Sequence, residues 1–287
     1  MLLFKNLHNK NLPKKANIGV FIKVGIALWS FFFILMYALW YTKDDMNGFH
    51  FFNDLPGWLG MDKVGHFFSS FQGVFFLGYW MLMSGVEKHK SIKYAFIGGF
   101  MLLFPIEILD GFSASWGFSI ADLTANTLGC LFATFLLSRQ SQLIIFPKSS
   151  FHFTSFAMLR PNLLGDNLLF QSIKDYNGQT YWLSFRLSDI FHTKIFPPWF
   201  LLSIGYGAEG MVGGDDNKFT SNGQYFDMSS IVRYSQWYIS FDIDWSYILP
   251  QNKFFLRGFY FLNFFKIPAP TLEFNNQIGF RFHWIYW

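Results

Sequence analysis

Long apolar runs dominate the first half of the chain. A helix that crosses a bilayer needs about 20 mostly apolar residues, because each residue advances the helix by about 1.5 Å. Four runs approach this length with at most one charged residue each: Val24–Tyr41, Phe67–Val86, Tyr94–Leu109 and Phe118–Ser138. The pattern therefore predicts a bundle of four transmembrane helices.

The charges between these runs predict an orientation. Four lysines lie in the first 15 residues and three more lie between residues 88 and 93, whereas Asp44, Asp45 and Asp54 separate the first two runs. Because lysine and arginine collect on the cytoplasmic side, we expect both termini in the cytoplasm and the acidic segments outside. The first run is too long for a signal-peptide core and no small-residue cleavage site follows it, so we expect a retained anchor.

The pattern changes to alternation near residue 147. From residue 237 to 245 the odd positions are Trp, Ile, Phe, Ile and Trp, and the even positions between them are Tyr, Ser, Asp and Asp. A period of two is typical of a β-strand, and Gly279–Trp287 alternates in the same way. We therefore predict an α+β membrane protein, with a four-helix membrane domain over residues 1–146. An aromatic-rich antiparallel β domain, membrane-apposed or outer-membrane-like, would follow over residues 147–287.

Other segments of the second half give weaker signals. Asn177-Gly178 is a turn signal before the strand-like run Gln179–Arg186, and Leu201–Ala208 is a second candidate strand. We expect Phe254–Phe265 to form a short amphipathic helix at a membrane surface. The polar, glycine-bearing segment Gly213–Tyr225 is expected to be a mobile loop.

Composition narrows the class of protein. Hydrophobic residues make up 52% of the 287 residues and aromatic residues 23%, whereas charged residues make up 14%, against about 25% in soluble domains. Disorder and a single soluble domain are therefore excluded. A net charge of +4 over 287 residues gives only a weak positive field, which disfavours a protein that binds nucleic acid through a basic surface. The one cysteine, Cys130, excludes an intrachain disulfide and a cysteine-based zinc site.

Polar and ionisable residues recur at the outer ends of the predicted helices. They are Asp62, Lys63, His66, Glu107, Asp110, Ser119, Asp122 and Asn126. In the predicted topology the second helix begins outside, the third ends there and the fourth begins there, so all three groups would meet at one level. Charge inside an apolar helix is costly, by about 2.5 kcal/mol at its centre, so such residues usually have partners or a task.

Details of spacing support this convergence. Asp62 and His66 are four residues apart and share a helix face, and Ser119 is placed to cap the fourth helix. Pro105 should free a carbonyl one turn earlier in the third helix. Gly98-Gly99 would allow a neighbouring helix to approach closely.

Three interpretations of the polar residues remain open. In the first, Lys63 and His66 neutralise carboxylates and lock the helix ends together. In the second, His66, Glu107, Asp110 and Asp122 hold a polar headgroup or a divalent cation such as Mg²⁺, Ca²⁺ or Mn²⁺, which prefer oxygen ligands. In the third, His66 or Glu107 acts as an acid or base on a lipid-linked substrate. No known catalytic motif accompanies these residues, so the sequence favours a protein that is not an enzyme.

Three short motifs carry a resemblance to a known family. They read DKVGH at 62–66, EILDG at 107–111 and GFSIAD at 117–122, followed by Asn126 and Gly129. Their order and spacing over residues 40–138 resemble the YfiM-like family of unknown function, which is distantly similar to VanZ-like membrane proteins. The segments RPNLLG at 160–165, KDYNGQTYWLS at 174–184 and GYGAEGM at 205–211 resemble the longer Bacteroidetes members of that family.

The resemblance implies a cell-envelope protein of a Gram-negative bacterium and brings no established reaction. VanZ-like proteins are associated with glycopeptide resistance, which points to envelope lipids or wall precursors. This chain departs from exported, lipid-anchored relatives because it has no lipobox cysteine and its helices are more apolar. We expect membrane lipid or an envelope assembly as partner, and no nucleic acid. Helix hydrophobicity favours the inner membrane, and the aromatic strands make the outer membrane the alternative.

Overall fold

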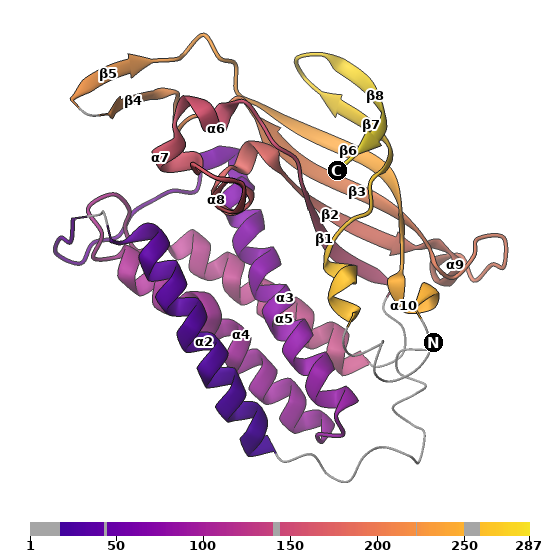
Figure 1. Cartoon of the computed structure of the whole chain (residues 1–287). Helices are drawn as coiled ribbons and strands as arrows, with labels where there is room; N and C mark the ends of the chain where they lie inside the picture. Colours follow the sequence, from indigo (N-terminus) through magenta and orange to yellow (C-terminus); the bar gives the residue numbers. More distant parts are fainter. Residues whose placement is uncertain (1–17, 43–44, 140–143, 222, 250–258) are drawn as a thin grey trace. The chain divides into compact units, whose positions relative to one another are not determined.

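The chain folds into two compact units in a computed structural model (Figure 1). The structure describes residues 18–42, 45–139, 144–221, 223–249 and 259–287. The first unit comprises Met1–Leu55 and Lys63–Gln142, and the second comprises Pro56–Asp62 and Leu143–Trp287. The second unit is therefore built from two separate stretches of the sequence. The four lysines within the first 15 residues, on which the predicted orientation of the first helix partly depends, lie outside the described residues.

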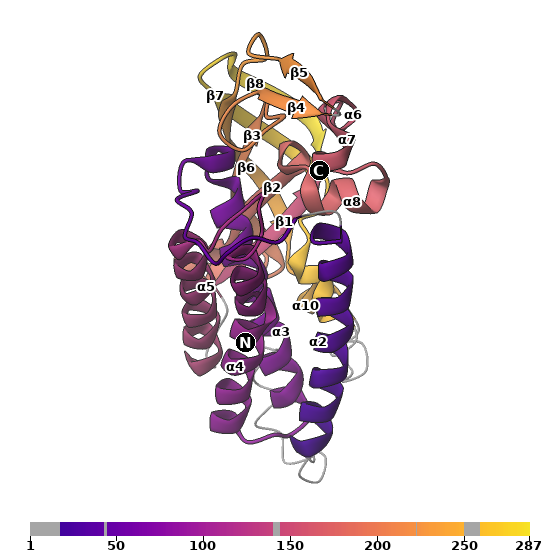
Figure 2. The same cartoon turned by 90° about the vertical axis from the view of Figure 1, so that its left-hand side faces the viewer.

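Four long helices run side by side in the first unit (Figures 1 and 2). They are α2 (Ile18–Trp40), α3 (Met61–Met83), α4 (Lys88–Asp110) and α5 (Ile120–Arg139). Among the described residues, α2, α4 and α5 are long and apolar enough to cross a membrane. The prediction of four such helices is wrong for α3, because Ser69, Ser70 and Gln72 interrupt its apolar run and polar residues occupy its first turns.

Small residues bring α3 close to its neighbours in this unit. A Cβ atom on Gly129 of α5 would lie 2.2 Å from the Phe67 carbonyl oxygen, and one on Gly99 of α4 would lie 2.8 Å from the Val74 amide nitrogen. Both distances are impossible contacts, so only glycine permits these approaches. The predicted close packing at Gly99 is confirmed. The approach at Gly129 brings the first half of α3 within reach of short polar side chains on α5.

The proline of α4 frees one carbonyl, as predicted. Pro105 has no N–H group, so the carbonyl oxygen of Met101 loses its helical donor. The indole Nε1 of Trp29 on α2 donates to that oxygen at 2.6 Å. The helix interruption is thus satisfied by a side chain from another helix, and the pair ties α2 to α4.

The second unit is centred on a six-stranded antiparallel sheet in the order β1-β2-β3-β6-β7-β8. Its strands are β1 (Ile145–Phe151), β2 (Gln179–Arg186), β3 (Phe200–Glu209), β6 (Tyr234–Ile243), β7 (Ala269–Asn275) and β8 (Gly279–Tyr286). A hairpin of β4 (Lys218–Ser221) and β5 (Gln224–Asp227) is separate from this sheet. In both views the hairpin lies beside the short helices α6 and α7 (Figures 1 and 2).

Short helices connect the strands. They are η1 (Gly57–Gly60), α6 (Phe156–Leu159), α7 (Pro161–Leu164), α8 (Leu168–Lys174), η2 (Tyr176–Gly178), α9 (Leu187–Ile190), α10 (Trp245–Ile248) and η3 (Tyr260–Phe264). The segment with η1 belongs to this unit because Met61 is fully buried against Ala208 and Met211. The hydroxyl of Tyr206 also donates to the carbonyl oxygen of Leu59 at 2.5 Å.

The alternating segments form strands as predicted, and other strands went unpredicted. The Asn177-Gly178 turn precedes β2, whose bounds match the predicted run, and β3, β6 and β8 lie where alternation indicated. The short strands β1 and β7 were missed because Pro147 and Pro270 interrupt their patterns.

Two predictions about connecting segments need correction. The predicted loop Gly213–Tyr225 instead contains β4 and the start of β5, because Phe219 and Phe226 stack across the hairpin at 5.2 Å. Of the helix predicted over Phe254–Phe265, the described part forms only the short 3-10 helix η3, and residues 254–258 lie outside the described residues.

The sheet buries its polar face and exposes its apolar face. On β6, Tyr238, Ser240 and Asp242 are at most 2% exposed, whereas Trp237 and Ile239 are 53% exposed. The sheet curls around its polar face, because the hydroxyl of Tyr286 on β8 lies 3.1 Å from the hydroxyl of Thr180 on β2. This arrangement is the inverse of a soluble sheet, which packs its apolar face against the core.

Candidate functional site

The start of α5 positions the first carboxylate of the candidate site. Ser119 precedes the helix, and its Oγ accepts a hydrogen bond from the Asp122 backbone N–H at 3.0 Å. The predicted helix cap is therefore confirmed. The Ser119 hydroxyl in turn donates to Oδ1 of Asp54 at 2.6 Å, so the cap also fixes an acidic residue from the loop before α3.

Lys63 bridges two carboxylates at this point. Its Nζ lies 2.7 Å from Oδ2 of Asp54 and 2.7 Å from Oδ1 of Asp122. Burial raises the pKa of Asp54, but hydrogen bonds with Asp122, Lys63 and Ser119 and the positive charge of Lys63 outweigh that effect. The pKa of Asp54 therefore lies below its usual value of 3.8.

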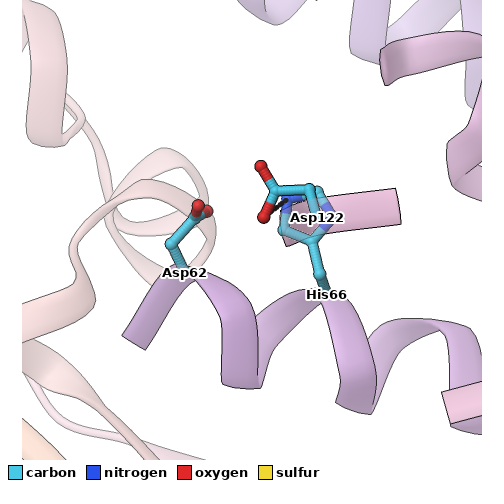
Figure 3. Close-up of side chains that lie close together, drawn as sticks. All are labelled: Asp62, His66 and Asp122. Carbon is cyan, nitrogen blue, oxygen red and sulfur yellow. Dashed lines mark ion pairs between the residues drawn. The ribbon is translucent and has the colours of Figure 1, made fainter. Parts of the chain in front are cut away.

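His66, Glu107 and Asn126 form the second half of the site. Nδ1 of His66 lies 3.2 Å from both Oδ1 of Asn126 and Oε1 of Glu107. The amide nitrogen of Asn126 donates to the same Glu107 oxygen at 3.1 Å, and the Ser70 hydroxyl donates to Oδ1 of Asn126 at 3.0 Å. Nε2 of His66 faces Oδ1 of Asp122 at 3.8 Å (Figure 3). The two halves of the site are therefore continuous.

We refer to the first unit's polar residues at this level as the carboxylate cluster. Its members are Asp54, Lys63, His66, Ser70, Glu107, Ser119, Asp122 and Asn126. The cluster holds three carboxylates against one lysine, so with His66 neutral it carries two excess negative charges. Such an excess in a mostly buried site requires protons or a bound cation.

Glu107 is the most exceptional member of the carboxylate cluster. Its side chain is 1% exposed, and its Oε1 contacts His66 and Asn126. Its Oε2 is buried and has no hydrogen-bond donor among the described residues. Buried carboxylate oxygens are normally satisfied, because an unpaired one costs the full desolvation penalty. Glu107 lies beside Nδ1 of His66 and Asp122 faces Nε2 of the same ring, and these three residues are the ones that we consider as cation ligands.

Two predicted site residues accept a hydrogen bond from a tyrosine hydroxyl. Asp110, at the end of α4, accepts one from Tyr41 at 2.5 Å. Asp62, one turn before His66 on α3 (Figure 3), accepts one from Tyr176 at 2.6 Å. We therefore leave Asp110 out of the candidate ligand set. The structure brings together the other six predicted residues.

Sequence reasoning missed Asp54 and Ser70 as members of the carboxylate cluster. Asp54 was predicted only as one of the acidic residues between the first two helices. That segment was expected on the same side of the membrane as the predicted site, which was the available signal. Ser70 lies one turn after His66, so its spacing on the same helix face was the available signal. Asp54 contacts Ser119 and Ser70 contacts Asn126, and in both pairs the two residues lie far apart along the chain, so sequence spacing does not predict the contact.

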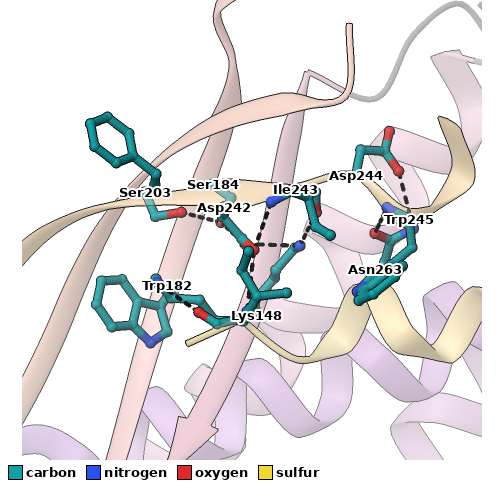
Figure 4. Close-up of polar contacts among 12 residues, drawn as sticks. Lys148, Trp182, Ser184, Ser203, Asp242, Ile243, Asp244, Trp245 and Asn263 are labelled. Atoms are coloured by element: carbon teal, nitrogen blue, oxygen red, sulfur yellow. Dashed lines mark hydrogen bonds and ion pairs between the residues drawn. The ribbon is translucent and has the colours of Figure 1, made fainter. Parts of the chain in front are cut away.

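A second polar network lies inside the sheet unit (Figure 4). Nζ of Lys148 lies 2.8 Å from Oδ2 of Asp242 and donates to the carbonyl oxygen of Ile243 at 2.7 Å. Both side chains of this ion pair are fully buried. Ser184 also donates to the same Asp242 oxygen at 3.0 Å. Arg186 pairs in the same way with buried Asp244.

Another group of polar side chains in the sheet unit lines a cavity of about 300 Å³. Nε2 of His283 lies 2.6 Å from Oε2 of Glu273, and His152 lies 3.7 Å from Glu209 on the same cavity. Gln236 and Asn275 both donate to the other oxygen of Glu273. The acidic groups of this cavity are therefore matched by donors, unlike Glu107.

Comparison with known families identifies one match. The family described as "Predicted periplasmic lipoprotein (DUF2279)" matches residues 50–138. That range contains every residue of the carboxylate cluster, together with α3, α4 and all of α5 but its last residue. The description points to the cell envelope. The YfiM-like and VanZ-like resemblances stay predictions. Searches of curated proteins and of solved structures found no match.

Proposed function

We propose that this chain is an integral membrane protein of the cell envelope whose carboxylate cluster binds a divalent cation. Three helices suited to crossing a bilayer, found within the described part of the chain, support the membrane assignment. The family description supports the envelope. The cluster lies at the ends of helices, where a site can be reached from the membrane surface.

The observation that carries the proposal is the buried Oε2 of Glu107, which has no donor among the described residues. Its neighbours, His66 and Asn126, both act on the other oxygen of the same carboxylate. A cation at Oε2 would supply the missing positive charge and would also offset the excess charge of the cluster. A purely structural clasp needs no such unsatisfied oxygen.

The donor set selects the kind of cation. Two carboxylates and one imidazole, from Glu107, Asp122 and His66, suit Mn²⁺ or Mg²⁺ better than a thiol-preferring metal. Mg²⁺ is usually held by one or two carboxylates together with phosphate oxygens. A lipid headgroup phosphate is therefore the second ligand that we expect beside the cation.

Manganese binding tests this proposal directly. The purified full chain, stripped with a chelator, would be titrated with Mn²⁺ and the free ion followed by electron paramagnetic resonance. We expect one Mn²⁺ per chain, and at least about tenfold weaker binding in Glu107→Gln and Asp122→Asn. Asp110→Asn is the matched control, because Asp110 lies three residues from Glu107 on the same helix but is bound by Tyr41.

Each outcome decides between interpretations. Unchanged binding in Asp110→Asn with loss in Glu107→Gln supports the site. No stoichiometric Mn²⁺ in the folded wild-type chain would leave the clasp, in which Lys63 and His66 neutralise the carboxylates. Equal loss in all three variants would contradict the ligand set. Turnover of a lipid-linked substrate that needs Glu107 but no cation would favour an enzyme instead.

A further inference from the structure

The outer face of the six-stranded sheet is a continuous apolar surface within the second unit. Side chains alternate between the two faces along β2, β3, β6, β7 and β8 as far as Trp284, so every second residue there points outward. These outward residues include Leu183, Ile204, Trp237, Ile239, Phe241, Leu272, Phe274, Phe280, Phe282 and Trp284, each at least 40% exposed. We call this set the outer apolar face. The outward positions of these five strands are all described, and none carries a charged residue.

The opposite face of the sheet carries the charged residues, most of which are buried. Lys148 pairs with Asp242 (Figure 4), Arg186 pairs with Asp244, and His283 pairs with Glu273. Ser184 and Ser203 also bond to each other at 2.7 Å across this face. The sheet therefore keeps its ions inside and its aromatic residues outside. In water this distribution is unfavourable, whereas in a bilayer it is the expected one.

The outer apolar face also lacks the groups that a protein partner would bind. Protein interfaces carry about one hydrogen bond per 100–200 Å². The outward tyrosines already use their hydroxyls inside the unit, since Tyr206 donates to Leu59 and Tyr181 donates to Gln179. Within the described outer apolar face, the side-chain donors that remain are the indole N–H groups of Trp237 and Trp284. A surface without charge or hydrogen-bonding capacity is complementary to hydrocarbon.

The length of the central strands also fits contact with the hydrocarbon layer of a bilayer. β3 and β6, at the centre of the sheet, are 10 residues long each. A strand that crosses the hydrocarbon layer of a bilayer at a tilt has about 9–11 residues. Their outward side chains pair directly, because Ile204 lies opposite Ile239 and Leu202 lies opposite Phe241. The apolar band is thus continuous across the centre of the sheet.

We infer that the outer apolar face of the sheet contacts the acyl chains of a bilayer. The sheet would then be a second membrane contact of this chain, in addition to the apolar helices. The inference rests on the side chains of the second unit and does not depend on the cation site of the first. It assigns a role to Trp237, Phe241 and Trp284 that differs from that of inward Trp182, which is 2% exposed.

Site-directed spin labelling tests this contact in the full chain. Cys130, the single cysteine, would be replaced in Cys130→Ala, and one cysteine would be introduced as Ile239→Cys, Ile204→Cys or Tyr225→Cys. Tyr225 is the matched control, because it is 62% exposed but lies on the hairpin strand β5. Each labelled chain would be reconstituted in vesicles of phosphatidylethanolamine and phosphatidylglycerol. Collisions of the label with oxygen, which enters hydrocarbon, and with a water-soluble nickel chelate would then be compared.

We expect labels at 239 and 204 to collide with oxygen at least about five times more than with the nickel chelate, and the label at 225 to show the reverse preference. Nickel accessibility at 239 and 204 similar to that at 225 would overturn the inference. Protection of 239 and 204 from both reagents would also overturn it, because it would show that protein covers the face. The two neighbouring positions keep the test decisive if one substitution prevents folding.

Discussion

The two units of the chain both bury charged groups, but they treat the charges differently. In the helical unit, two carboxylates share one lysine, and one oxygen of a third carboxylate, Glu107, has no donor among the described residues. In the sheet unit, Asp242 accepts from Lys148 and Ser184 on one oxygen and from two backbone N–H groups on the other. The contrast separates a network whose acceptors are satisfied within the fold from a cluster for which we propose a ligand.

The reason for the contrast lies in what each network must achieve. The buried ions of the sheet hold a curled sheet together from within, so every missing bond would cost stability. The carboxylate cluster gives up some stability, since its excess charge is unfavourable until a cation or proton arrives. Stability measurements on matched variants of the two networks can therefore distinguish their roles.

The largest effect is expected for the central ion pair of the sheet. Lys148→Met leaves Asp242 buried without its cation, which should destabilise the sheet unit by about 3–5 kcal/mol. Chemical unfolding followed by tryptophan fluorescence would measure this loss. Lys218→Met is the control, because its ion pair with Asp227 is exposed and 3.7 Å long, and it should change stability by less than about 1 kcal/mol. Similar losses in both variants would contradict a structural role for the buried pair.

A pH-dependent effect of similar size is expected for Lys266. Burial lowers the pKa of this lysine from 10.5 to about 8, although Asp242 opposes the shift. Between these pH values the folded sheet binds fewer protons than the unfolded chain, so stability should rise with pH. The rise should total up to about 3 kcal/mol. Unfolding of Lys266→Met between about pH 8 and pH 10 should lack this rise, and an identical slope in both proteins would refute the assignment.

A smaller effect of opposite sign is expected in the carboxylate cluster. Without metal, Glu107→Gln removes a buried charge yet keeps an oxygen that accepts from Asn126, so it should stabilise the chain by about 1 kcal/mol. The equivalent change in the sheet, Asp242→Asn, should destabilise it instead. Chemical unfolding in the presence of a chelator would compare the two. Destabilisation by both variants would mean that Glu107 belongs to a structural clasp.

The smallest effect is expected for Asp54 at low pH. Its folded pKa lies below 3.8, so its ionised form stabilises the fold above that pH, and this contribution disappears as the pH falls through the lowered pKa. Asp54→Asn should therefore reduce the difference in melting temperature between about pH 6 and pH 3. A wild-type acid sensitivity retained in this variant would show that another group is responsible.

Particular residues show which helices and strands could be predicted from the sequence and which could not. The apolar runs placed four helices, and alternation placed β6 and β8, because both patterns depend only on neighbours along the chain. The apolar character of α3 was overestimated, because the run Phe67–Val86 contains no charged residue and many phenylalanines. The uncharged polar residues Ser69, Ser70 and Gln72 were therefore not treated as an interruption. The strands β1 and β7 were missed, because prolines obscure short patterns that the neighbouring strands stabilise.

The sequence by itself determined which residues alternate and which polar groups sit at helix ends. Only the tertiary structure decided that the polar side of the sheet is the inner one, that Asp54 joins Lys63, and that Asp110 binds Tyr41. The physical reason is the separation along the chain of the residues on which each property depends. Periodicity is local, whereas burial and the pairing of charges depend on contacts between residues that lie far apart along the chain.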